Sequence, residues 1–284
     1  MTTDVTSRLA YTAAKARHRW HHRRASGAPL VVFSMAKTGS SSVAAGLRAA
    51  GHGPVHHVHD LDPELLASEE AEYRWAGRPW RNWDAQALLR HPATSAAPWR
   101  VVTMVRDPIA QTVSAFFQPG ARRGYVHPAA TVGSLRERFG DRLDRLPLHW
   151  FESHLLPTLG IDVYATAFDA ERGYRIVSTP TLRLLILRCE GLDAAPQALA
   201  ELLDATDPVP VPSLNQGNDK GYADLYASFR ASLRPTAAQL DTAYGSRLVR
   251  HFYSPEEIVR FRALWSGDPI DPADPAPRGG ETAR

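Results

Sequence analysis

Cysteine is almost absent from the sequence. The single residue Cys189 excludes a disulfide framework within the chain and a metal site built from cysteine ligands, and its apolar neighbours predict that it is buried. No apolar run approaches the roughly 18 residues of a membrane-spanning helix, and the N-terminal segment lacks the apolar core of a secretion signal. We therefore expect a soluble protein located in the cytoplasm.

Beyond the N-terminus, positive and negative charges nearly balance, so the net charge is small. The formal net charge is +3, and residues 1–24 alone carry +5, so the remaining chain carries −2. Basic and aromatic residues are not interleaved here in the pattern of a nucleic-acid site, so no nucleic-acid partner is expected. Two alternatives stay open for residues 5–24: a helix that makes peripheral contact with a membrane surface, or a solvated arm.

The rest of the chain has the length of one folded domain. A chain of 284 residues can bury a sizeable core, and nothing in it requires a second domain. Pro, Gly and Asp dominate the C-terminal end, which has no apolar face. We predict a basic arm over residues 1–28, one domain over residues 29–265 and a disordered tail over residues 266–284. The sequence indicates no oligomeric state.

A short apolar run, Leu30 to Phe33, turns through a small polar loop into a helical pattern. The run is β-branched and does not alternate, as expected of a strand buried on both faces of a parallel sheet. A glycine lets the loop backbone approach a ligand, and the first N–H groups of a helix have no partner within it. With the hydroxyls and a lysine they predict an anion site, with one of the serines as N-cap. The predicted binding residues are Lys37, Thr38, Gly39, Ser40, Ser41 and Ser42.

The position of the lysine separates two kinds of phosphate loop. In the loop of nucleoside triphosphatases the Lys follows the last Gly, whereas Lys37 precedes Gly39 by two residues. This order disfavours ATP and GTP. In addition, no apolar strand ends in an acidic residue suited to magnesium, so a kinase is the weakest alternative.

A second apolar run, Val101 to Val105, ends in Arg106-Asp107-Pro108 and leads into another helix, with Asp107 expected at its N-cap. The two motifs, in this order, resemble those of sulfotransferases that use 3′-phosphoadenosine-5′-phosphosulfate (PAPS). The resemblance implies that the Lys37 loop holds the 5′-phosphosulfate. It also implies that Arg106 and Ser114 hold the 3′-phosphate, which a guanidinium and a hydroxyl suit chemically.

The same resemblance implies a fold and a third contact region. The fold would be P-loop-like: a single α/β domain with a central parallel sheet flanked by helices. A polar glycine-containing loop over residues 213–222 stands where that family has the loop that covers the donor. By this resemblance, Asn218 and Lys220 are further candidate contacts.

Several histidines lie near the end of a predicted strand around residue 55. On a strand, His57 and His59 share one face and His56 lies on the other. Residues that end this strand should face the first loop, because the carboxyl ends of parallel strands meet at one crevice. Several carbohydrate sulfotransferases take their catalytic base from this region, which implies His59, then His57, then Glu64; the alternative is that they are structural or surface residues. Zinc is not expected, because no cysteine or spaced histidine pair supports it.

Residues 73–99 are rich in tryptophan and arginine, residue types that suit sugars and anionic acceptors. A satellite core is the alternative. The candidate acceptor residues are Trp75, Arg78, Trp80, Arg81 and Trp83. Three basic residues of a later segment are expected to face solvent: Arg122, Arg123 and His127.

The C-terminal half is expected to contain five further features. They are an amphipathic helix over 146–160, an extended segment from Ile161, a buried strand over 182–192, a linker-like turn over 208–212, and two helices over 236–265.

Over residues 30–265 the pattern is similar to the bacterial branch of capsular polysaccharide synthesis proteins. Residues 160–164 and 251–258 carry this closer resemblance. Gln111 departs from it, because many relatives have a basic residue there, and this leaves one phosphate contact in doubt. We therefore predict an enzyme that moves a sulfuryl group from PAPS to a hydroxyl of a glycan or glycolipid without a metal. The alternatives are an inactive nucleotide-binding scaffold and a sulfotransferase that acts on a small aromatic or lipid alcohol.

Overall fold

The protein is described from a computed structural model. The described parts of the chain are residues 16, 29–75, 82–90, 98–122, 124–127, 129–213 and 221–267. The predictions for the basic arm, apart from residue 16, and for residues 268–284 lie outside this range. The boundaries proposed at residues 28 and 265 stay predictions.

One domain is built around a five-stranded sheet in which four strands are parallel. The strand order is β2-β1-β3-β5-β4, and the edge strand β4 is antiparallel to β5. The predicted α/β fold with a central sheet is therefore confirmed, and the antiparallel edge is an addition. The strands are β1 (Leu30–Phe33), β2 (Val55–Val58), β3 (Trp99–Val105), β4 (Tyr174–Ser178) and β5 (Leu182–Arg188).

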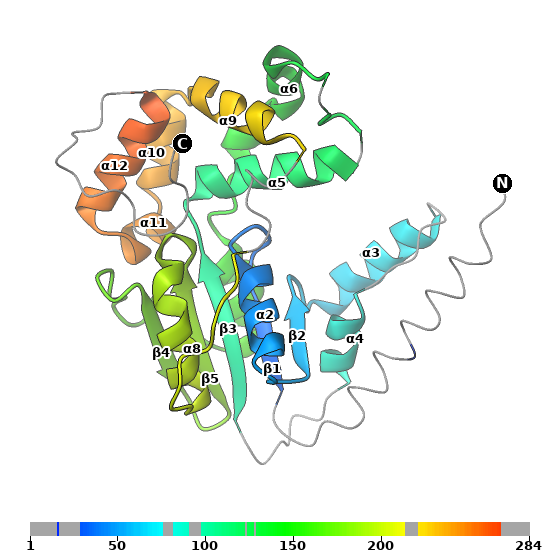
Figure 1. The fold of residues 1–284 in the computed structure, drawn as a ribbon, viewed down its shortest axis with the longest axis vertical. Helices are drawn as coiled ribbons and strands as arrows, with labels where there is room; N and C mark the ends of the chain where they lie inside the picture. Colours follow the sequence, from blue (N-terminus) through cyan, green and yellow to red (C-terminus); the bar gives the residue numbers. More distant parts are fainter. Residues whose placement is uncertain are drawn as a thin grey trace.

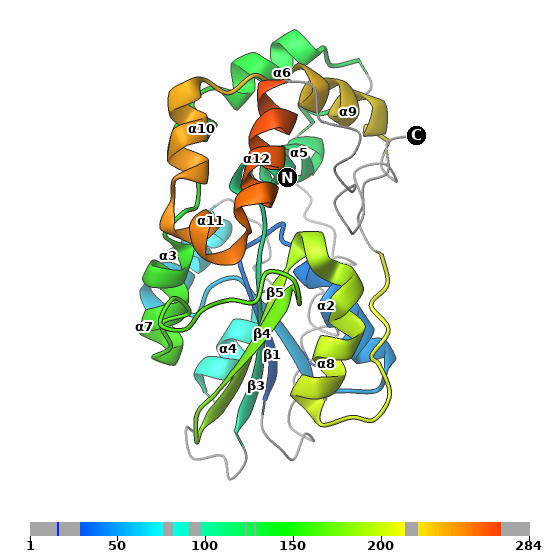
Figure 2. The ribbon, with the colours of Figure 1, turned by 90° about the vertical axis from the view of Figure 1, so that its left-hand side faces the viewer.

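Helices cover both faces of the sheet (Figure 2). Alternate strand residues such as Val32 and Met104 pack beneath α2 (Ser40–Ala49) and α8 (Ala195–Leu203). Phe33 belongs to the core on the opposite face. That face carries α4 (Trp83–Leu89) and α7 (Leu156–Leu159), and α3 (Pro63–Trp75) follows β2 at the edge. Because both faces are covered, the central strands β1, β3 and β5 are predominantly apolar, whereas the edge strand β2 carries two histidines.

A helical layer lies beyond the carboxyl ends of the strands (Figure 1). Phe116, Phe139 and Phe229 join three of its helices, with ring centroids 5.3 to 5.9 Å apart. The carboxyl ends of the parallel strands therefore face this layer of helices, and the loop between β1 and α2 lies beneath it. The layer consists of α5 (Pro108–Arg122), α6 (Val132–Phe139), α9 (Ala223–Ser232), α10 (Ala237–Tyr244), α11 (Arg247–Phe252) and α12 (Pro255–Ser266).

Several local expectations were wrong. Residues 161–164 form a turn, because Asp162 accepts a hydrogen bond from the N–H of Tyr164. By contrast, the helix expected over 146–160 is confirmed over a shorter range, where a π-helix (Phe151–Leu155) runs directly into α7. The C-terminal segment contains three helices where two were expected, because Ser246 starts α11 as an N-cap.

Two further expectations concern the end of β5 and the segment after α8. The strand stops at Arg188, and a 3₁₀ helix (Cys189–Ala194) follows, so Cys189 is only half-buried. Residues 208–212 are more than a linker: Val209 is buried, and the Pro210 carbonyl lies directly over Gly46 of α2. A methyl group on Gly46 would stand 2.4 Å from that oxygen.

We predict that Gly46→Ala lowers the free energy of unfolding by about 1–3 kcal/mol, because the added methyl overpacks this contact. Urea denaturation at pH 7 measures the change. Gly133→Ala is the control: it also lies in a helix, and its nearest atom would be 3.8 Å away. The control should not lose stability, and an equal loss in both variants would contradict the assigned contact.

Candidate functional site

The loop between β1 and α2 has the geometry of an anion site. Lys37 and Gly39 both have positive φ, 70° and 89°. Gly39 is the N-cap of α2, and no side chain caps this helix, so the predicted serine cap was wrong. The first N–H groups of α2 therefore point out of the helix toward the loop, where an anion is favoured.

Gly39 is required for two reasons. Its φ is one that side chains rarely adopt, and a Cβ there would lie 3.2 Å from Leu192 and 3.3 Å from Met104. Thr38 is fully buried and donates to the Met35 carbonyl at 2.8 Å. The Ser34 hydroxyl lies 2.8 Å from the Thr38 hydroxyl and accepts the Met104 N–H at 3.1 Å. Thr38 thus supports the loop through its hydroxyl, and the loop is fixed to β3.

One face of α5 lines the same loop. Gln111 donates to the Ala36 carbonyl at 2.8 Å, and Gln118 accepts the Lys37 ammonium. Ser114 lies three residues after Gln111 and four residues before Gln118, so it shares their face of the helix. At the start of α5, Arg106 donates to the Lys37 carbonyl at 3.0 Å. The structure therefore gathers Lys37, Arg106 and Ser114 around one loop, with Gln111 holding the loop backbone in place of a basic residue.

The two candidate base histidines meet this loop from the end of β2. The ring centroids of His57 and His59 are 5.0 Å apart. His57 Nε2 lies 3.0 Å from the Ser40 hydroxyl, and His59 Nδ1 donates to the Ser34 carbonyl at 2.7 Å. A carbonyl only accepts, so this bond fixes the proton of neutral His59 on Nδ1 and leaves the lone pair on Nε2.

Both histidines are held in the neutral form. Burial, together with the neighbouring His59 and Arg48, lowers the pKa of His57 to about 4, and Asp84 acts in the opposite direction. His59 is exposed along part of its surface, yet the protein packed around it desolvates its charged form and lowers its pKa. The nearby Lys37 acts in the same direction, whereas the Ser34 carbonyl opposes it. Glu64 lies in the exposed first turn of α3, and His56 points away, beside Asp84.

A buried carboxylate network joins this site to the C-terminal helices, and sequence analysis missed it. Asp107 accepts from the Ile109 N–H, from the Tyr244 hydroxyl at 3.1 Å and from Trp265 Nε1 at 2.9 Å. Glu190 accepts from the Asp107 N–H at 2.9 Å and from the Tyr253 hydroxyl at 2.8 Å. The Asp107-Pro108 pair predicts a helix start. Nothing in a single sequence indicates that Asp107 would bind aromatic residues more than a hundred positions away.

We predict that Asp107→Asn costs about 1–3 kcal/mol of unfolding free energy at pH 7, because one amide cannot accept all three donors in that buried space. Chemical denaturation provides the measurement. Asp141→Asn, which removes an exposed ion pair with Arg145, should change stability by less than about 1 kcal/mol. An Asp107→Asn protein as stable as the Asp141→Asn control would contradict the network.

Other candidate residues are not gathered at the loop. Trp75 is 92 % exposed at the end of α3, and Trp83 is half-buried in α4. His127 is exposed, as expected, but it also lines a pocket. Seven candidates lie outside the described residues or have undescribed side chains: Arg78, Trp80, Arg81, Arg122, Arg123, Asn218 and Lys220.

Comparison with known proteins adds one finding. Residues 126–254 match the model of a family described as "putative capsular polysaccharide synthesis protein". The matched region contains α6 to α11, β4 and β5, whereas the Lys37 loop, both histidines and Arg106 lie before it. No curated protein and no solved structure matches the chain. Among the described residues, no helix is both long and apolar enough to cross a membrane.

Proposed function

We propose that the protein is a sulfotransferase that moves a sulfuryl group from PAPS to a hydroxyl of a glycan or glycolipid. The observation that carries this proposal is the convergence of Lys37, Arg106, Ser114 and His59 on one uncapped helix N-terminus. Two cationic side chains, a hydroxyl and backbone N–H groups form a donor set suited to a nucleotide that is phosphorylated at two positions.

The residues have distinct roles in this proposal. The Lys37 ammonium and the N–H groups at residues 39–41 would bind the 5′ end of the donor, and Arg106 and Ser114 would bind the 3′-phosphate. When bound, PAPS supplies the sulfuryl group and a bisphosphate leaving group. Lys37 and the N–H groups stabilise negative charge that grows on the leaving side, so the proposed displacement needs no metal.

His59 is the proposed general base. Its Nδ1–H is held by the Ser34 carbonyl, so Nε2 is the atom that accepts the acceptor's proton. His57 is the second candidate, but its Nε2 already lies against the Ser40 hydroxyl. His57 therefore suits a role in positioning Ser40 and the start of α2.

The acceptor class rests on the match to a protein family. The match of residues 126–254 to a family described by capsular polysaccharide synthesis supports a glycan-related acceptor. A small aromatic or lipid alcohol is the runner-up acceptor. The alternative outside the enzymes is a nucleotide-binding scaffold without catalytic activity. The neutral His59 beside the loop disfavours it.

Calorimetry with 3′-phosphoadenosine-5′-phosphate and with ATP, each with and without magnesium, tests the donor. We expect tighter binding of the bisphosphate and no effect of magnesium, because Lys37 precedes the loop glycine and the loop has no carboxylate that would hold magnesium. Preference for ATP, or binding that requires magnesium, would end the sulfotransferase proposal.

Lys37 is expected to contribute more to turnover than to binding, since its strongest interaction is with charge of the transition state. Lys37→Ala should lower kcat by roughly 10- to 150-fold, the scale of one charged hydrogen bond. Lys37→Gly should lose the same activity but be about 1 kcal/mol more stable than Lys37→Ala, because glycine accepts the positive φ. Arg106→Ala should instead weaken bisphosphate binding. Unchanged kcat in both Lys37 variants would remove this role.

The pH profile tests the base. The pKa of His59 lies below its ordinary value near 6.5, so the active neutral form predominates at pH 7. We expect kcat to be level above pH 7 and to fall as pH drops below 6.5. His59→Gln should lower kcat by about 10²- to 10⁴-fold and abolish the fall of kcat at low pH. If His57→Gln did so and His59→Gln did not, the base would be His57.

A further inference from the structure

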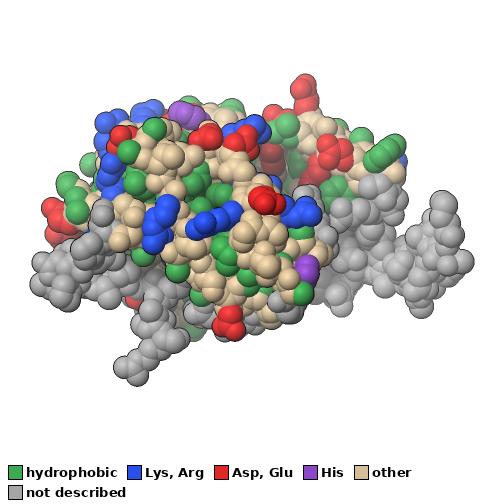
Figure 3. All heavy atoms as spheres, turned by 90° about the horizontal axis from the view of Figure 1, so that it is seen from above, with side chains coloured by type: hydrophobic (Ala, Val, Ile, Leu, Met, Phe, Trp, Pro, Cys, Tyr) green, Lys and Arg blue, Asp and Glu red, His purple; other side chains and the backbone are tan. Residues whose placement is uncertain are grey.

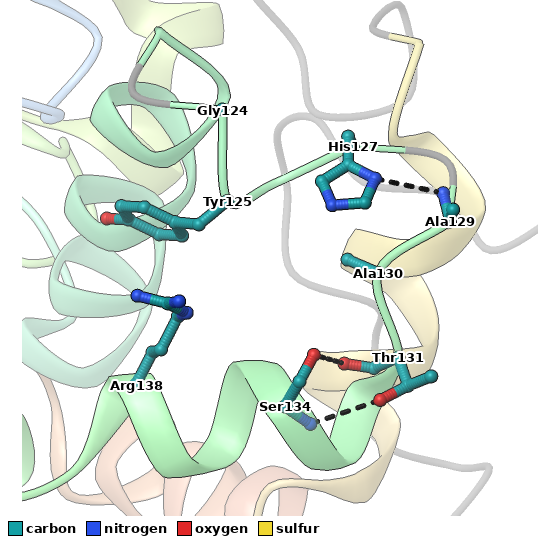
Figure 4. A pocket seen from close by; sticks show the side chains of 8 residues that line it. All are labelled: Gly124, Tyr125, His127, Ala129, Ala130, Thr131, Ser134 and Arg138. Carbon is teal, nitrogen blue, oxygen red and sulfur yellow. Dashed lines mark hydrogen bonds between the residues drawn. The ribbon is translucent and has the colours of Figure 1, made fainter.

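A second site candidate lies on the helical layer, between the segment 124–131 and α6 (Figure 4). It is an open pocket of about 530 Å³, a size within the range of ligand sites. Tyr125 and Arg138 stand together at one end, and His127 lies at the other. The lining residues are Gly124, Tyr125, His127, Ala129, Ala130, Thr131, Ser134 and Arg138.

The polar groups of this pocket favour an anion. His127 Nδ1 accepts the Ala129 N–H at 3.2 Å, so neutral His127 carries its proton on Nε2 and offers a donor there. The Arg138 guanidinium lies 5.5 Å from the centre of the Tyr125 ring, and a guanidinium matches a carboxylate in a bidentate manner. The lining contains no Asp or Glu.

This positive character is local. On the face of the molecule seen in Figure 3, the basic and acidic side chains of the described residues are interspersed, so these residues do not favour anions over that face in general. Thr131 and Ser134 place hydroxyls along the side of the pocket, whereas the Tyr125 ring already contacts the Arg138 guanidinium and the Phe116 ring. An anionic sugar combines the features that match: a carboxylate for Arg138 and several hydroxyls for the polar side of the pocket.

The pocket lies on the other side of α5 from the phosphate loop. The Tyr125 hydroxyl donates to the Phe116 carbonyl, whereas Gln118 accepts the Lys37 ammonium. Residues two apart on a helix point to opposite sides, so the two sites are separated by roughly one helix diameter, about 10 Å. A ligand that reaches both sites must be longer than a single sugar.

We propose that this pocket binds a carboxylate-bearing sugar of the acceptor, at a distance along the glycan from the hydroxyl that reacts. The role assigned to the pocket rests on the proposed function, because only an acceptor that also reaches the loop site would connect the two sites. It selects an acidic oligosaccharide over a neutral glycan and over a small alcohol.

Binding to the full-length protein tests the pocket without any turnover. The probes are an oligosaccharide that contains glucuronate and its neutral glucose counterpart, measured by calorimetry at fixed ionic strength. We expect the acidic probe to bind more tightly, and Arg138→Gln to weaken it by about 10-fold. His127→Ala should weaken it by a smaller factor. Arg145→Gln, which removes the same charge from a residue whose side chain is 78 % exposed and lies outside the pocket, is the control and should bind as the wild type does.

Three outcomes would overturn the proposal: equal binding of both probes, no effect of Arg138→Gln, or acetate binding as tightly as the acidic sugar. Bisphosphate binding by each variant is measured in parallel and should not change. If the bisphosphate fails to bind the wild type while the acidic probe binds through Arg138, the pocket stands and the sulfotransferase proposal fails. The converse result would refute the pocket alone.

Discussion

The buried carboxylate of Asp107 is the group on which the arrangement of the site depends. It lies at the start of α5, directly after the strand that ends in Arg106, and it accepts hydrogen bonds from Tyr244 of α10 and Trp265 of α12. Burial raises its pKa, and the bonds from Trp265, Ile109 and Tyr244 act in the opposite direction. A buried carboxylate without these donors would be costly. These hydrogen bonds therefore hold α10 and α12 against the start of α5.

Glu190 extends the same constraint to the sheet and to the loop. Burial raises its pKa, while the Asp107 N–H and Arg106 favour its charged form. Next to it, Arg188 at the end of β5 pairs with Glu257 of α12 at 2.6 Å. Because Arg106 also donates to the Lys37 carbonyl, the loop is linked through a few polar contacts to the C-terminal helices α10 and α12. Part of the matched segment 126–254 lies against the loop as well, since a Cβ on Gly39 would stand 3.2 Å from Leu192.

The parts predictable from sequence were those set by local rules. The apolar runs of β1 and β3, the glycine loop and the Asp107-Pro108 start of α5 follow from period, propensity and capping, and the structure has them. The pairing of His57 with His59 on one face followed from strand geometry. Partners of Asp107 were not predictable, because Trp265 is 158 residues away and its ring gives no local signal. The same holds for Gln118, whose contact with Lys37 depends on how α5 crosses the loop.

Transfer of radiolabel from PAPS to a polysaccharide fraction is the measurement that tests the central claim most directly. The account predicts label on a hydroxyl of an acidic polysaccharide with the wild-type protein, without added metal, and a loss of that label in His59→Gln. Label on no acceptor, despite tight binding of the bisphosphate, would contradict the enzyme and favour a nucleotide-binding scaffold.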